Sequence, residues 1–95
     1  MRPATPHPTE GVYAISVAAS MVRMQVQNLR VYERRGLLSP ARTPGGTRLY
    51  SAADVERLHR IRDLLAEGLN LAGIARVLEL EEENARLRAR LAERR

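Results

Sequence analysis

The sequence predicts a mainly α-helical fold: a winged helix-turn-helix with a β-hairpin wing, followed by a C-terminal helix that dimerises as a coiled coil. Two short amphipathic segments close together in the first half predict the helical pair. Two alternating segments on either side of a Pro-Gly-Gly turn predict the hairpin. Apolar residues at heptad spacing near the C-terminal end predict the coiled coil. At 95 residues, the chain can form one small domain and one helix that needs a partner.

The helix-turn-helix is predicted from caps and from two packing residues. The first helix is expected to begin after Ser16, a good N-cap, and the second to span about residues 25–35. Gly36 follows, at the position after a helix that favours positive φ. Ala19 is small enough for a close helix crossing, and Leu29 would lock that crossing. The spacing alone also suits other helical hairpins.

The wing and the third helix are predicted from turn and cap signals. Strands are expected at residues 41–43 and 47–50. Ser51 then caps a third helix, with Asp54 placed to complete a capping box, and Gly68 ends it. The inner stripe of that helix is expected to contain Val55, Leu58, Ile61 and Leu65.

The last helix is predicted to begin after Asn70, with Leu71, Ile74 and Leu78 on its apolar side. The heptad pattern that follows spans roughly two heptads, too few for stability without a partner helix, so a homodimer is predicted. The alternative is a solvated tail that frays after Glu83. The expected seam, in which an asparagine would set the register, consists of Val77, Leu80, Asn84, Leu87 and Leu91.

These elements divide the chain into three parts. Residues 1–11 hold three prolines and few apolar residues, which predicts a disordered leader. Residues 12–78 are expected to form the winged helix-turn-helix, and residues 79–95 the dimerisation helix.

The basic charge of the chain lies in its first half. Residues 1–50 carry seven arginines and two acids (7 − 2 = +5), whereas residues 51–95 carry nine of each and are neutral. An excess concentrated in one region is typical of a surface that meets a polyanion such as DNA.

The second helix carries the side chains expected on a reading surface. Amide and guanidinium groups bind adenine and guanine edges in the major groove. For Arg30 the alternative is an ion pair with Glu33, three residues further along the helix, which would not prevent a phosphate contact. The predicted reading residues are Gln25, Gln27, Asn28, Arg30 and Arg34.

The wing offers two more cations. Arg42 and Arg48 flank the hairpin turn and can project toward the phosphate backbone or a narrow minor groove. Tyr50 lies two residues after Arg48, on the same strand face. Its hydroxyl either donates to a phosphate or packs with its ring under the wing, and the sequence favours neither.

Other classes of function fit poorly. The chain has no cysteine, and its two histidines lie far apart, so we expect no catalytic residue, no metal site and no cofactor. The acids within residues 79–83 are expected to form a solvated helix face. No apolar stretch is long enough to span a membrane and no signal peptide is recognisable, which predicts the cytoplasm and the bacterial nucleoid.

Residues 28–40, which read NLRVYERRGLLSP, together with residues 15–16, Ala19 and residues 48–50, resemble the start of MerR-family regulators. The resemblance covers residues 12–80 without a gap. Within the family, two further segments are similar to the heat-shock repressor branch called HspR: residues 67–74, which read EGLNLAGI, and residues 79–81.

The resemblance implies a dimer that pairs through an antiparallel coiled coil and binds an inverted-repeat operator in double-stranded DNA. The HspR branch further implies repression of heat-shock and chaperone genes, with the chaperone DnaK as corepressor until heat stress draws it away. The family's recognition-helix and wing positions fall on Gln25, Gln27, Asn28, Arg30, Val31, Arg48 and Tyr50.

The chain also departs from the family pattern. Arg23 stands where most relatives have a turn glycine and adds a cation near the DNA, while Asn28 and Val31 are unusual on the reading helix. We expect no small-molecule effector, because the C-terminal helix leaves no length for a sensor domain. Two alternatives stay open: an architectural or excisionase-like accessory DNA-binding protein, and a protein-interaction module.

Overall fold

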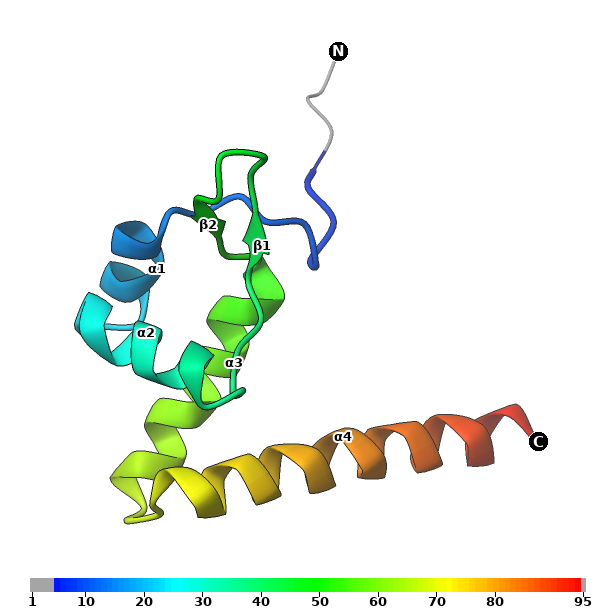
Figure 1. The fold of residues 1–95 in the computed structure, drawn as a ribbon. Helices are drawn as coiled ribbons and strands as arrows, with labels where there is room; N and C mark the ends of the chain where they lie inside the picture. The colour runs from blue at the N-terminus through cyan, green and yellow to red at the C-terminus, as the bar shows by residue number, and fades with distance from the viewer. Residues whose placement is uncertain (1–4, 95) are drawn as a thin grey trace. The chain divides into compact units, whose positions relative to one another are not determined.

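The computed structural model describes residues 5–94 and confirms the mainly helical fold with a hairpin wing (Figure 1). The chain divides into two compact units, one ending at Arg62 and the other beginning at Asp63. Within the described residues the elements follow the order α1 (Ile15–Met21), α2 (Val26–Arg34), β1 (Ala41–Arg42), β2 (Arg48–Leu49), α3 (Ala52–Ala66) and α4 (Leu71–Glu93).

The first helix begins earlier than the sequence predicts. Its N-cap is Ala14, so Ser16 lies inside α1 and does not cap it. The reason is the backbone pairing that precedes the helix: Tyr13 forms an antiparallel bridge with Tyr50, and the next residue is still extended. The helix therefore starts directly where this pairing ends.

The helix pair otherwise forms as expected. Ala19 and Leu29 are both buried, and α2 lies within one residue of its predicted bounds at each end. Gly36 has φ +76°, and the N–H of Leu37 donates to the carbonyl of Tyr32, which closes the helix end.

The wing is a short antiparallel hairpin in which Arg42 faces Arg48 across the strands. Gly46 has φ +87° in its turn, and its N–H donates to the carbonyl of Thr43 at 2.8 Å. The strands are shorter than predicted, because the ladder includes only two residues on each side.

Part of the predicted disordered leader has hydrogen-bonded backbone. The N–H of Glu10 donates to the carbonyl of His7, and the carbonyl of Pro8 accepts from the N–H of Ala53 at 2.9 Å. Ala53 lies in the first turn of α3, where N–H groups have no partner within the helix, so the preceding segment supplies one. Residues 1–4 lie outside the described residues.

The capping box that begins α3 is confirmed. The N–H of Ser51 donates to Oδ2 of Asp54 at 2.9 Å, and the N–H of Asp54 donates to Oγ of Ser51 at 3.0 Å. The core of the first unit contains Ala18, Ala19, Val22, Leu29, Tyr32, Leu37, Leu38, Tyr50, Val55, Leu58 and Ile61.

The predicted inner stripe of α3 is wrong at its end. Leu65 is 37% exposed, whereas Leu64 is 2% exposed. Leu64, and not Leu65, is thus on the buried side of the helix at the start of the second compact unit, which begins at Asp63. Its buried residues include Ile74 and Leu78 as predicted.

The last helix is continuous from Leu71 to Glu93, so no break separates the predicted parts at residue 78. Asn70 caps it as predicted, since its Oδ1 accepts from the N–H of Gly73 at 2.8 Å. The assignment of residues 79–95 to dimerisation stays a prediction.

Candidate nucleic-acid interface

The predicted reading residues lie on α2 and at its N-cap, Gln25. Leu29 and Tyr32 are buried on the inner face of α2, which leaves its opposite face to solvent. Val31 is half-buried at the edge of that face, and Arg23 is exposed in the preceding turn. The exposed members are Gln25, Gln27, Asn28, Arg30 and Arg34. Their accessibility suits a groove-binding surface, and their contact with DNA stays a prediction.

Arg23 adopts the backbone conformation that a turn glycine would supply. Its φ is +55°, the one positive φ among non-glycine residues of the described chain. The turn is closed by N–H groups of Arg23 and Met24, which donate to the carbonyls of Ser20 and Ala19. The departure from the family pattern therefore leaves the turn geometry intact and exposes an additional cation.

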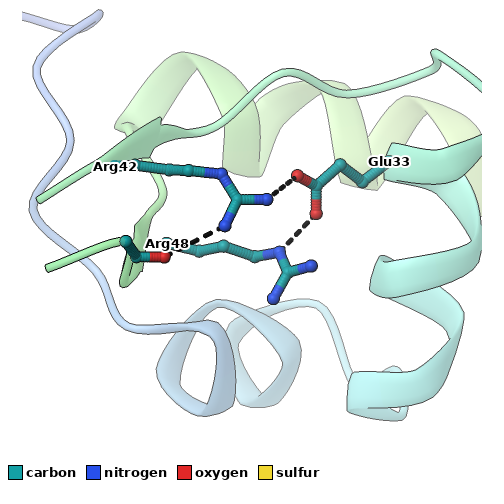
Figure 2. Close-up of polar contacts among 4 residues, drawn as sticks. Glu33, Arg42 and Arg48 are labelled. Carbon is teal, nitrogen blue, oxygen red and sulfur yellow. Dashed lines mark hydrogen bonds and ion pairs between the residues drawn. The ribbon is translucent and has the colours of Figure 1, made fainter.

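Glu33 on α2 binds both wing arginines (Figure 2). Arg42 donates from Nη2 to Oε1 of Glu33 at 2.6 Å, and Arg48 donates from Nε to Oε2. Figure 2 shows the two guanidinium groups reaching from the wing strands toward the single carboxylate. We call these three residues, Glu33, Arg42 and Arg48, the wing anchor.

The wing anchor rules out the simplest alternative for Arg30. Both carboxylate oxygens of Glu33 accept from wing arginines, and no ion pair to Arg30 is found within residues 5–94. The spacing of three residues along the helix is by itself compatible with an Arg30–Glu33 ion pair. Residues nine and fifteen positions away occupy the carboxylate instead.

The charge state of Glu33 reflects this environment. Partial burial raises the pKa of its carboxyl, but the hydrogen bonds and charges of Arg48 and then Arg42 outweigh burial, and the net pKa is lowered. Glu33 is therefore ionised at neutral pH, and its side chain is only 18% exposed.

The structure favours the packing alternative for Tyr50. The residue is completely buried, and its hydroxyl has no hydrogen-bond partner within the described chain. Burial is the main cause that raises the pKa of this phenol. A direct phosphate contact would require the side chain to leave the core.

The predicted dimerisation stripe lies on the outside of α4. Leu80, Leu87 and Leu91 are among the most exposed large apolar residues, at 53%, 48% and 64%. Val77 is half-buried, and Oδ1 of Asn84 accepts from Nε of Arg88 at 2.6 Å. The stripe is open to a partner, and its pairing stays a prediction.

The residues that the structure describes contain no group of three or more histidine, cysteine, aspartate or glutamate side chains suited to a metal ion. None of the helices in that part of the chain is long and apolar enough to cross a membrane.

Residues 13–81 match the family described as MerR HTH family regulatory protein. The chain belongs to the MerR family. It is 53% identical over 83 residues to the putative heat shock protein HspR of Streptomyces coelicolor, covering 86% of this chain and 55% of that protein. It is 41% identical to the transcriptional regulator GlnR of Bacillus anthracis, covering 75% and 55%. The chain thus spans about half the length of these curated relatives.

Solved structures of the MerR family share the fold. The transcription regulator PbrR691 of Ralstonia metallidurans, in complex with lead(II), superposes with a TM-score of 0.69 at 33% identity, covering 86% of this chain and 71% of that one. HiNmlR, a MerR-family regulator that lacks the sensor domain and is bound to promoter DNA, gives 0.64 at 25% identity, covering 85% and 74%. The chain therefore shares its fold with MerR-family regulators, one of which, HiNmlR, is bound to promoter DNA.

Proposed function

We propose that this MerR-family regulator represses heat-shock and chaperone genes by binding an inverted-repeat operator as a homodimer. The observation that carries the proposal is the 53% identity to a protein named as a putative HspR, which extends over 86% of the chain. A match of that extent spans the reading helix, the wing and the start of α4. The proposed regulator has no catalytic activity or dedicated small-molecule effector and acts in the cytoplasm, at the nucleoid.

The DNA contacts follow from the exposed side chains. Gln25 and Asn28 lie at the N-terminal end of α2, the part of a recognition helix that meets base edges. Arg48 on the wing and Arg23 in the turn supply cations for phosphates. Helix α4 pairs two such units, because its apolar stripe needs a partner.

Selection from random duplex DNA, followed by sequencing of the bound pool, tests this function. We expect an inverted repeat whose half-sites are spaced to suit two reading helices on one DNA face. A pool without symmetry would contradict the dimeric operator, and cooperative filaments on any DNA would favour the architectural alternative.

Two substitutions then test the assigned contacts. Arg48→Ala should weaken binding to all DNA about equally, whereas Asn28→Ala should change the preferred bases at one half-site position. Equal weakening on selected and random duplex by both variants would contradict direct readout by α2.

The corepressor is proposed from the resemblance to the HspR branch alone. Purified DnaK is expected to raise occupancy of the selected operator in a gel-shift titration, with heat-denatured protein as competitor. Unchanged operator affinity at saturating DnaK would remove DnaK from the proposal and leave the DNA-binding function intact.

A further inference from the structure

The two wing arginines use their donors differently. Arg42 donates from Nη2 to Glu33 and from Nη1 to the carbonyl of Gly46 at 3.0 Å, so both of its terminal nitrogens are engaged within the protein. Arg48 donates to Glu33 from Nε. Its two terminal nitrogens make no hydrogen bond to any residue within 5–94. Both terminal nitrogens of Arg48 thus remain available to a further anion, whereas each terminal nitrogen of Arg42 already donates one hydrogen bond within the protein.

We propose that Glu33 and Arg42 are positioning residues for DNA binding, which together present the terminal nitrogens of Arg48 to a DNA phosphate. The proposal rests on the DNA-binding function of the family and adds a division of roles within the wing anchor. Arg42 closes the hairpin through Gly46 and joins it to α2, whereas Arg48 contacts the DNA.

The geometry explains how the carboxylate of Glu33 can orient the guanidinium of Arg48. A guanidinium is planar, so a hydrogen bond at Nε restrains the plane and leaves the terminal nitrogens on the far side as a fork for phosphate oxygens. Glu33 belongs to the reading helix and Arg48 to the wing, so this bond sets the wing contact relative to the base-reading face. A wing without the anchor would bring the same charge to DNA in many orientations.

Simple electrostatics predicts the opposite effect for Glu33. An acid on a DNA-binding surface repels phosphate, and Glu33→Gln would raise the formal net charge of the chain from +5 to +6. If Glu33 were only a repelling charge, its removal would tighten binding. If Glu33 is a positioning residue, its removal weakens binding despite the more favourable charge. The two accounts therefore differ in sign.

The first experiment measures affinity for the duplex that wild-type protein selects and for a random duplex of equal length. We expect Glu33→Gln to weaken binding to the selected duplex by roughly three- to tenfold. The matched control is Glu56→Gln, which removes the same charge from an exposed position on α3 and should bind as wild type or slightly tighter. Equal or tighter binding by Glu33→Gln would overturn the proposal. Failure of wild type to select any sequence would instead count against the proposed repressor function.

A double-mutant cycle shows whether Glu33 acts through Arg48. In the Arg48→Ala background, Glu33→Gln should cause little further loss of affinity, because the group that it positions is absent. A merely structural role for Glu33 would give the same loss in both backgrounds and would contradict the proposal. Thermal unfolding of each variant checks that every protein in the cycle is folded.

The salt dependence of affinity separates the two arginines without altering Glu33. The slope of log affinity against log salt reports the phosphates contacted, and losing one contact lowers it by about 1. We expect Arg48→Gln to lower the slope in this way. Arg42→Gln should weaken binding to the selected duplex while keeping the wild-type slope. A slope reduced equally by both variants would show that both arginines contact phosphate and would refute the division of roles.

Discussion

At the scale of single residues, the turn between α1 and α2 contains an arginine in a backbone conformation that favours glycine. Arg23 adopts φ +55°, a conformation that costs a residue with a Cβ about 1–2 kcal/mol. Glycine would avoid this cost but would lose more conformational entropy on folding, about 0.5–1 kcal/mol. The chain thus keeps a cation at the tip of the turn at a small cost in stability.

Arg23→Gly is therefore expected to raise the free energy of unfolding by about 0.5–1 kcal/mol, since relief of strain exceeds the entropy loss. Arg23→Ala is the control, because it removes the same charge and keeps the Cβ, and its stability should match wild type. Urea denaturation measures both. Both variants should bind DNA with equally reduced affinity, because both lack the charge of Arg23. A glycine variant no more stable than the alanine variant would show that the turn is not strained.

Glu33 makes stability depend on pH in a defined direction. Its pKa is lowered in the folded state, so the anchor contributes stability above the usual carboxyl pKa of about 4.3, and this is lost as pH falls through the folded pKa. The stability difference between wild type and Glu33→Gln should be about 1 kcal/mol at neutral pH. It should shrink below about pH 4 in urea denaturation. A difference that stays constant on acidification would contradict the ionised anchor.

At the scale of elements, the wing depends on the segment that precedes α1. Tyr13 pairs with Tyr50 through reciprocal hydrogen bonds, and this pairing extends the hairpin beyond its two short strands. Gly11 lies at the closest approach: a Cβ there would be 2.8 Å from the carbonyl oxygen of Leu49 and 2.9 Å from its Cβ. Only glycine fits without movement of backbone.

Gly11→Ala is expected to destabilise the protein by about 1–3 kcal/mol, because a backbone oxygen and a side chain must shift to admit the methyl group. Gly45→Ala in the wing turn is the matched control, since the nearest atom to its Cβ would be Oγ1 of Thr43 at 3.9 Å. Thermal unfolding compares the two. Equal melting temperatures would mean that the segment does not pack against the wing.

At the scale of the whole molecule, the proposed function depends on pairing two DNA-binding units. Charged residues flank the exposed apolar stripe of α4, as they flank a coiled-coil seam. A dimer doubles the number of groove contacts, and the second half-site then binds at high effective concentration.

Leu87→Glu is expected to make the protein monomeric by sedimentation, because a charge would be buried in the seam. Its affinity for a full inverted repeat should fall at least about tenfold, while affinity for an isolated half-site stays unchanged. Ala89→Glu adds the same charge to α4 off the predicted seam and should remain dimeric. A dimeric Leu87→Glu variant would show that subunits pair elsewhere.

Local signals in the sequence determined the order and type of the elements. The Ser51–Asp54 capping box, the cap at Asn70 and the positive φ of Gly36 were all predictable, because each depends on atoms within a few residues along the chain. The exposed reading face of α2 was likewise predictable from helical periodicity. These are the features on which the family resemblance also depends.

Only the tertiary structure decided which distant groups meet. Leu64 is buried in place of Leu65, and Tyr50 lies in the core. Glu33 forms ion pairs with the two wing arginines and not with Arg30. Periodicity cannot choose among such partners, because several side chains of the right chemistry lie at suitable spacing. The choice depends on how separate elements pack. A lone acid on a basic reading helix was the only signal in the sequence that pointed to the anchor.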